Sequence, residues 1–380
     1  MYLPSLPSMA LNLQASNSMM QLTLTVYIFT LGLSQLIYGP FTDRYGRRPI
    51  FLLGYFIFTL ASAGCYFSHT ASQLLVARFF QGLGAGCGFV VSNAMIADLF
   101  HGRKLARMIA LGSFTWSLTP IVAPVIGGFV QEYMGWRINF LIILIYSTVL
   151  FIAFLFLLPE SLAKEDRHSL HPVKLLSSYG AILKNVTFLG LIIGVMASYG
   201  AIIAFNVIGP FILQDALHVT PSHYGIDVFI IGLSYTLGLY INTLLLKKWP
   251  MLVVLGMGVL WTMLSGVFLI AFHFFNWFDV FSVVLGTCIL QVAQGLVFPS
   301  SLSGSLFLFA HHKGAVSALF GSLVLLGCTA VSAVIAPLHI LSELDLGIVY
   351  TALGALGIAG YLLVLITKPA ALTQDEAPEH

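Results

Sequence analysis

Long apolar segments alternate with short polar breaks along almost the whole chain. The apolar segments lie near residues 18–41, 50–68, 72–99, 105–131, 138–158, 186–213, 223–246, 251–274, 279–309, 315–339 and 347–367. A helix of about 20 apolar residues crosses the roughly 30 Å hydrocarbon core of a bilayer, and every segment has about this length or more. The pattern therefore predicts eleven full membrane-spanning helices.

A short segment, Met1–Pro7, precedes the first long one and is followed by a polar stretch through Asn17. Seven residues cannot cross a bilayer, and the segment lacks the basic and apolar regions of a signal peptide. We expect it to be the end of a first helix that is largely missing. A complete first helix would make twelve.

Composition agrees with a lipid environment, since 59% of the residues are hydrophobic and 8% are charged. Soluble domains carry about 25% charged residues, so a water-soluble fold is excluded and no room is left for a soluble enzyme module. The four cysteines lie in apolar stretches without metal-ligand spacing, so we expect them to be buried and to bind no metal.

The basic residues fall on alternate loops. One side receives Arg44, Arg47, Arg48, Arg103, Lys104, Arg107, Lys164, Arg167, Lys174, Lys184, Lys247, Lys248, Lys313 and Lys368. The opposite loops have Arg137 as their only base. By the positive-inside rule the first side is cytoplasmic, and the carboxyl terminus lies on that side.

The longest polar break divides the chain into two halves. We predict an amino-terminal bundle at 1–158, a cytoplasmic central loop at 159–185, a carboxy-terminal bundle at 186–367 and a cytoplasmic tail at 368–380. A faint repeat supports two six-helix halves: Gln81-Gly82-Leu83 recurs as Gln294-Gly295-Leu296, and Gly112-Ser113 as Gly321-Ser322. Both matches have an offset of about 210 residues, as expected for a duplicated transporter half.

The most informative polar segment is Gly39–Pro49, between the second and third helices of the twelve-helix count. Gly39 permits close helix approach, and Gly46 can take a positive φ angle. Asp43 can accept from the amino terminus of a neighbouring helix, and Arg47 can pair with Asp98. Alternatively, the segment only follows the positive-inside rule, but that rule would require only Lys or Arg and not the interspersed Asp and Gly residues.

This segment resembles the G-x-x-x-D-R-x-G-R-R loop of the major facilitator superfamily. Further segments are similar to motifs of its drug:proton antiporters of the bicyclomycin-resistance type: Met1–Pro7, Arg78–Gly86, Pro120–Gly128, Gly135–Phe140, Leu158–Ser161 and Gly209–Phe211. Thr119 and Ala123 stand where the fifth-helix motif prefers Gly. The resemblance implies an all-α integral membrane protein with the major facilitator fold.

The resemblance also assigns roles to residues. It implies a conformational latch of Gly39, Asp43, Arg44, Gly46, Arg47, Arg48 and Asp98, proton coupling by Arg78 and Gln81, and a hinge at Pro120, Pro124, Gly127 and Gly128. An arginine within a span is costly, so Arg78 either faces a polar partner or snorkels to the membrane surface. Asp227 either complements the dipole of its helix or belongs to a proton site.

The predicted function is proton-coupled export of small amphipathic compounds or drugs by alternating access. The resemblance implies a monomer in the bacterial inner membrane that uses the proton gradient, needs no cofactor and has a small molecule, protons and the lipid bilayer as partners. Nucleic acid is not among them, and no catalytic motif such as H-E-x-x-H or G-x-S-x-G is present. A dedicated metabolite or siderophore transporter is one alternative.

A transport-inactive receptor or scaffold is an alternative from another class. In the resembled branch a first-helix carboxylate stands directly before the segment that matches Met1–Pro4. We therefore expect the upstream reading frame to add about 15–25 mostly apolar residues containing an Asp near their end. Without this acid, the scaffold alternative gains weight.

Overall fold

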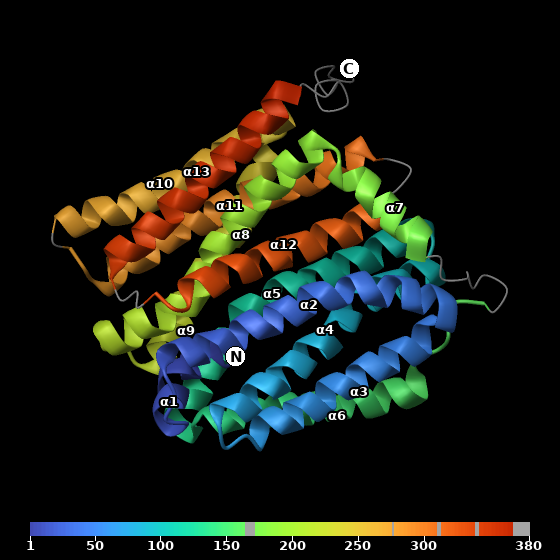
Figure 1. Cartoon of the computed structure of the whole chain (residues 1–380), viewed down its shortest axis with the longest axis horizontal. Helices are drawn as coiled ribbons and strands as arrows, with labels where there is room; N and C mark the ends of the chain where they lie inside the picture. The colour runs from blue at the N-terminus through green and yellow to red at the C-terminus, as the bar shows by residue number, and fades with distance from the viewer. Residues whose placement is uncertain (164–171, 276, 310–312, 339–341, 368–380) are drawn as a thin grey trace. The chain divides into compact units, whose positions relative to one another are not determined.

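The computed structural model describes residues 1–163, 172–275, 277–309, 313–338 and 342–367 (Figure 1). Eleven long helices account for most of these residues: α2 (Asn17–Tyr45), α3 (Arg47–Tyr66), α4 (Ala71–Leu99), α5 (Gly102–Met134), α6 (Trp136–Leu157), α8 (Val186–Phe211), α9 (Pro221–Leu245), α10 (Met251–Phe274), α11 (Val280–Leu308), α12 (Lys313–Ile335) and α13 (Glu343–Thr367). All of them except α5 also contain, among the described residues, an apolar window long enough to cross a membrane. The predicted all-helical membrane fold is confirmed.

The segment ahead of α2 folds into a 3-10 turn at Leu3–Ser5 and the short helix α1 at Leu6–Asn12. Its apolar residues Leu6 and Met9 are fully buried. Asn139 Nδ2 of α6 donates to Ser5 Oγ at 3.1 Å. The segment is thus an integral part of the packing around α5 and α6.

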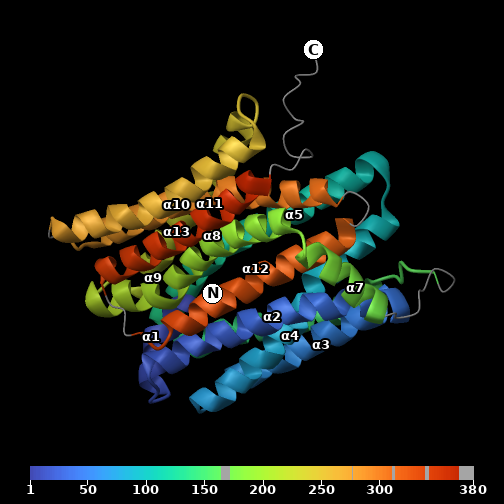
Figure 2. The same ribbon diagram turned by 45° about the horizontal axis from the view of Figure 1, so that its top comes forward.

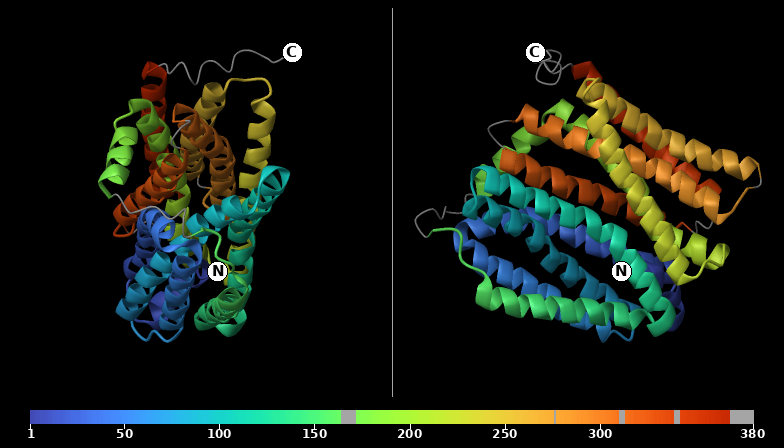
Figure 3. Two further views of the ribbon diagram at one scale, coloured as in Figure 1. Left: turned by 90° about the vertical axis from the view of Figure 1, so that its right-hand side faces the viewer. Right: turned by 180° about the vertical axis from the view of Figure 1, so that it is seen from behind.

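Two compact units make up the chain. Unit 1 comprises Met1–Pro172 together with Thr220–Gly225, and unit 2 comprises Val173–Val219 and the residues from Ile226 onward. In unit 1, α4 has extensive contacts with both α2 and α3, and α6 packs along the other side of α3 (Figure 3).

Unit 2 is organised around α8, which contacts α11, α12 and α13. Helix α10 packs along α13 and α11, and Figure 2 shows these three helices running side by side. Most residues of α8 are buried, as expected for a helix that is apolar on all sides and covered by neighbours.

The repeated Gln-Gly-Leu motif makes the same kind of contact in each unit. A Cβ atom at Gly82 of α4 would collide with the Tyr27 carbonyl oxygen and Thr30 Oγ1 of α2. A Cβ at Gly295 of α11 would lie 2.6 Å from the backbone of Gly238 in α9. The glycine is therefore needed in both places because two helix backbones approach closely.

The predicted central loop contains a helix, α7 (Pro172–Leu183). Leu175, Leu176, Tyr179 and Leu183 recur at helical spacing, so the segment is amphipathic although it is too short to cross a membrane. Burial raises the pKa of the Tyr179 hydroxyl. The polar composition of the break concealed this helix from the sequence analysis.

Candidate functional site

The turn between α2 and α3 depends on one glycine. Gly46 ends α2 and begins α3 with φ +99° and ψ 156°, a backbone region that is essentially restricted to glycine. The predicted positive φ is confirmed. This sharp turn brings the last residues of α2 next to the first residue of α3.

Arg47, the first residue of α3, is the centre of a polar cluster. Its Nε donates to Asp98 Oδ2 of α4 at 3.1 Å, which confirms the predicted pairing. Its Nη1 donates to Asp43 Oδ1 and to Thr42 Oγ1, both from α2. One mostly buried guanidinium thus joins the ends of three helices.

The end of α6 completes the cluster, and the sequence analysis did not assign it a role there. Glu160 Oε1 accepts from the Arg47 backbone N–H at 2.9 Å, and Ser161 Oγ donates to Asp98 Oδ2 at 2.9 Å. Arg48 Nη2 donates to the Leu155 carbonyl oxygen at 2.7 Å. The only signal in the sequence was Leu158-Pro159-Glu160-Ser161, where proline ends the helix before two polar residues.

Two expectations for this turn need correction, and one predicted member of the latch lies outside the cluster. Glu160, not Asp43, accepts from the amino terminus of α3, because Asp43 is engaged with Arg47. A Cβ at Gly39 would meet only Val90 Cγ1, at 4.0 Å, so the predicted close approach there is wrong. Arg44 is exposed and stacks over the ring of Tyr45 at 5.1 Å.

A second cluster surrounds Arg78 in α4. The side chain is only 5% exposed, so it does not snorkel to the membrane surface. Its guanidinium carbon lies 3.9 Å from the ring centre of Tyr27 and 4.4 Å from that of Tyr2. Arg78 Nη1 donates to Gln81 Oε1, as their shared helix face predicts.

Gln81 fixes this guanidinium to a third helix. Its Nε2 donates to Ser62 Oγ of α3 at 2.8 Å. Arg78 Nε is buried without a hydrogen-bond acceptor, and no carboxylate pairs with Arg78 within the described residues. A buried charge with one unsatisfied donor is costly, so the cluster favours an anionic or strongly accepting group beside Nε.

The glycines of α5 lie at close backbone contacts. A Cβ at Gly127 would collide with the Met1 carbonyl oxygen, and one at Gly128 would collide with the Pro221 carbonyl oxygen. A Cβ at Gly225 would lie 2.7 Å from the Pro124 carbonyl oxygen. The predicted close approach at Gly127 and Gly128 is confirmed; Pro120 and Pro124 lie inside the same helix.

Glu132, at the end of α5, caps the start of α9 within unit 1. Its Oε2 accepts from the Ser222 N–H at 3.0 Å. Hydrogen bonds from the Ser222 side chain and backbone lower the pKa of the carboxyl, with smaller contributions from Thr220 and His223. Asp227 is half-buried in the part of α9 that belongs to unit 2.

Long apolar helices in two units, a charged interhelical turn and a buried arginine define a polytopic membrane protein of the carrier type. The Major Facilitator Superfamily matches residues 1–332, and the chain therefore belongs to this family of secondary transporters. It is accordingly a multi-pass membrane protein with a small-molecule substrate, and not an enzyme.

Relatives and a solved structure agree. The chain is 31% identical over 332 residues to the uncharacterized MFS-type transporter YdgK of Bacillus subtilis (strain 168), covering 86% of this chain and 81% of YdgK. It is 26% identical to multidrug resistance protein D of Escherichia coli (strain K12), covering 93% of this chain and 89% of that protein. A crystal structure of a D-xylose-proton symporter is similar in fold, with a TM-score of 0.73, 15% identity and coverage of 96% and 92%.

Proposed function

We propose that this secondary transporter exports small amphipathic compounds in exchange for protons by alternating access. The buried, incompletely paired guanidinium of Arg78 is the observation that carries the proposal. Similarity to multidrug resistance protein D, whose name refers to drug resistance, supports the substrate class. A substrate of this kind would partition from water or lipid into a largely apolar cavity.

Arg78 is suited to proton coupling because of its surroundings. A guanidinium lowers the pKa of any carboxylate brought close to it, and the effect is large where water is excluded. Gln81 and Ser62 hold Arg78 against α3, so a shift of α3 along α4 would change the position of the charge. The proton affinity of a carboxylate beside Arg78 Nε would then differ between conformations, and this difference is what coupling of proton movement to transport requires. We include Asp227 as a second titratable group in unit 2.

The Arg47 cluster has the features of a conformational latch. It joins α2, α3, α4 and the end of α6 through charge-assisted hydrogen bonds. Such bonds contribute about 1.5–3 kcal/mol each when partly buried, which is comparable to the energy difference between two transporter conformations. We assign Asp43, Gly46, Arg47, Arg48 and Asp98 to this latch and add Glu160 and Ser161. Gly39 and Arg44 are left out, because Gly39 makes no close helix approach and Arg44 stacks on Tyr45.

Gly127 and Gly128, with Pro120 and Pro124, form the proposed hinge. Because glycine has no side chain, the backbones that meet at Gly127 and Gly128 can move past each other. Each proline removes one backbone hydrogen bond from the helix. We further propose that the Arg47 cluster faces the cytoplasm of a bacterium, that the inner membrane is the location, and that the monomer is the working unit.

Dye efflux from energised cells tests the proposal. The protein, expressed from its longest reading frame, should lower dye accumulation, and a protonophore should abolish the effect. Arg78→Ala should abolish export and Asp43→Asn should reduce it, with membrane levels checked for each variant. Export that resists the protonophore would refute proton coupling. Unchanged accumulation of every compound tried would favour a dedicated metabolite carrier or a transport-inactive receptor. Full activity of both variants would refute the assigned roles.

A further inference from the structure

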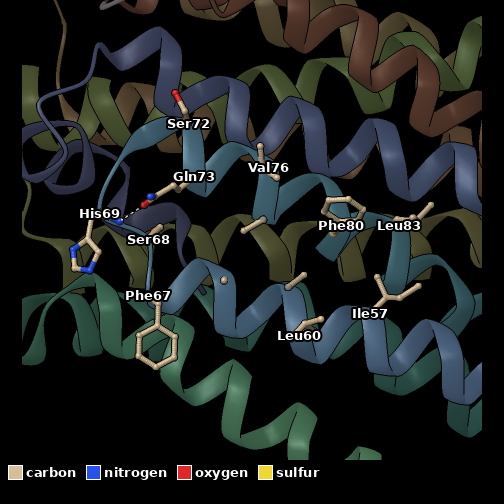
Figure 4. Close-up of a pocket in the computed structure, with 13 residues that line it drawn as sticks. Ile57, Leu60, Phe67, Ser68, His69, Ser72, Gln73, Val76, Phe80 and Leu83 are labelled. Atoms are coloured by element: carbon tan, nitrogen blue, oxygen red, sulfur yellow. Dashed lines mark hydrogen bonds between the residues drawn. The ribbon is translucent and has the colours of Figure 1, made fainter.

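A groove of about 860 Å³ opens between α3 and α4 in unit 1 (Figure 4). Its volume lies in the range of about 300–1,000 Å³ that holds a small molecule or a large part of one. The walls are almost entirely apolar, with Ile57, Leu60 and Gly64 from α3 and Val76, Phe80 and Leu83 from α4. The groove lies beside Ala77, whereas Arg78 makes its contacts with α2, Tyr2 and Gln81.

The groove has a polar end. Ser68, His69, Ser72 and Gln73 line it at the turn between α3 and α4. The His69 backbone N–H donates to Gln73 Oε1 at 2.9 Å, which fixes the edge of this turn (Figure 4). Polarity therefore changes along the groove from a hydrogen-bonding rim to an apolar interior, as it does along an amphipathic lipid.

The length of the groove matches one leaflet of a bilayer. On α4 the lining residues Ser72 and Leu83 are eleven positions apart, and on α3 the lining extends from Ile57 into the turn at Ser68. At 1.5 Å per residue the α4 wall extends about 16 Å, roughly half of a 30 Å hydrocarbon core. Leu60, Phe67 and Val76 remain exposed along it, so lipid can enter from the side.

Arg137 does not line the groove itself but places a cation next to the polar end. Its Nη2 donates to the carbonyl oxygen of Ser68, a residue of the rim, at 3.1 Å. Its guanidinium also stacks on the buried Trp136 ring at 4.2 Å, which fixes its plane. A guanidinium has five N–H donors. Among the described residues, Arg137 donates a hydrogen bond to Ser68 alone. The remaining donors suit a phosphate group.

We propose that this groove binds one anionic phospholipid, with an acyl chain between α3 and α4 and its phosphate beside Arg137. In the orientation proposed above, with the Arg47 cluster facing the cytoplasm, this end of the groove lies in the outer leaflet. Phosphatidylglycerol has the required chemistry: a single negative charge, a phosphate and long acyl chains. The site is separate from both clusters assigned to transport, and its occupancy can be measured without a transported compound.

Matched variants test the site. Leu60 and Leu53 both lie on α3 and are 63% and 52% exposed, but only Leu60 lines the groove. Leu60→Trp and Val76→Trp should fill the groove, whereas Leu53→Trp should leave it open. Arg137→Gln removes the charge but retains a donor for Ser68. Thermal unfolding in detergent establishes that each variant is folded.

The measurement is phospholipid retained by the purified full chain after exposure to equal amounts of phosphatidylglycerol and phosphatidylcholine, quantified by native mass spectrometry. Wild type and Leu53→Trp should retain one phosphatidylglycerol in preference to phosphatidylcholine, and both groove-filling variants should lose it. Arg137→Gln should lower the preference about tenfold, as expected for loss of a charge-assisted contact to phosphate. Equal retention by Leu60→Trp, Val76→Trp and Leu53→Trp would overturn the proposal. The proposal would also be overturned if wild type showed no preference for phosphatidylglycerol. It would likewise be overturned if an exported dye displaced the lipid at the concentrations that support transport.

Discussion

Arg47 is the residue on which the charged turn depends. Its position follows from Gly46, which allows α2 and α3 to meet so sharply that Asp43 and Arg47 lie one helical turn apart in sequence and in contact. The sequence predicted this glycine from the turn pattern, and it predicted the Asp98 pair from opposite charges at the ends of two predicted helices. Glu160 lies 113 positions from its partner Arg47, and Ser161 lies 63 positions from its partner Asp98. No local sequence pattern connects either pair.

Substitution of Gly46 tests the turn. Gly46→Ala should lower the free energy of unfolding by about 1–3 kcal/mol, because alanine is strained at this φ and ψ. Gly88→Ala is the control: the structure leaves open space around Gly88, and alanine favours a helix interior by about 0.5–1 kcal/mol. Thermal unfolding in detergent should therefore give shifts of opposite sign. A stabilising effect of Gly46→Ala would contradict the assigned backbone conformation.

The two carboxylates that contact Arg47 should differ in their contribution to stability. The side chain of Asp98 is 24% exposed and that of Asp43 is 50% exposed. Asp98→Asn should cost about 1–2 kcal/mol and Asp43→Asn less than about 1 kcal/mol, because exposed ion pairs are screened by water. Combining Asp98→Asn with Ser161→Ala in a double-mutant cycle should reveal coupling, since Ser161 donates to Asp98. Additive effects would argue against a connected cluster.

At the scale of helices, glycines decide which pairs pack closely. Gly266 and Gly347 bring α10 and α13 together, and Gly190 and Gly360 do the same for α8 and α13. In a membrane the lipid is as apolar as the side chains, so close backbone contact and van der Waals packing supply much of the association energy. The positions of the helices could be predicted from hydropathy, but the pairing could not, because glycine also occurs at Gly88 and Gly112, where an added Cβ would meet nothing within 4 Å among the described residues.

The repeated glycines provide a test in both units. Gly82→Ala and Gly295→Ala should each destabilise the protein by about 1–3 kcal/mol, since the added methyl group meets backbone that cannot move aside. Gly88→Ala again serves as the reference. The apparent melting temperature and the fraction of monodisperse protein report the effect. If both substitutions are as well tolerated as Gly88→Ala, the close approaches at these helices are wrong.

Glu132 links α5 to the start of α9 in a manner that depends on pH. Its lowered pKa means that the folded state favours the carboxylate, so its contribution is present at neutral pH and is lost as the pH falls through the folded pKa. Glu132→Gln should lower the apparent melting temperature at pH 7, and the difference from wild type should disappear at a pH below the lowered pKa of the carboxyl. The shift will be small because the carboxylate is exposed. A difference that is the same at both pH values would exclude the charge as its cause.

For the whole molecule, the sequence predicted the class of fold more fully than its functional sites. Eleven apolar segments correspond to eleven helices because burial in lipid imposes length and hydrophobicity on every span. Side-chain contacts such as Gln81 with Ser62, or His273 with Glu343 at 2.9 Å, join two different helices. Their partners depend on helix rotation, which hydropathy does not determine.

The two halves share a repeat but differ in charge at equivalent places. Asp43, four residues after Gly39 in the first half, is half exposed and contacts Arg47. Asn242, four residues after Gly238 in the second half, is buried and accepts from Ser300 Oγ at 3.3 Å. The Arg47 cluster therefore has no charged counterpart at Asn242 in the described residues of the second half. This asymmetry predicts that exchanging Asp and Asn will have opposite consequences in the two halves.

Asp43→Asn should leave folding nearly intact and reduce transport, because it weakens an exposed contact of the proposed latch. Asn242→Asp should instead reduce the amount of folded protein, since a buried carboxylate beside a serine hydroxyl lacks a cationic partner and costs several kcal/mol. The amount of monodisperse protein extracted from membranes separates the two effects from dye efflux measured on the same cells. Ser300→Ala controls for loss of the hydrogen bond alone and should be milder than Asn242→Asp. If Asn242→Asp folds and transports like wild type, the burial and pairing assigned to Asn242 are wrong, and the charge asymmetry of the two halves has no energetic consequence.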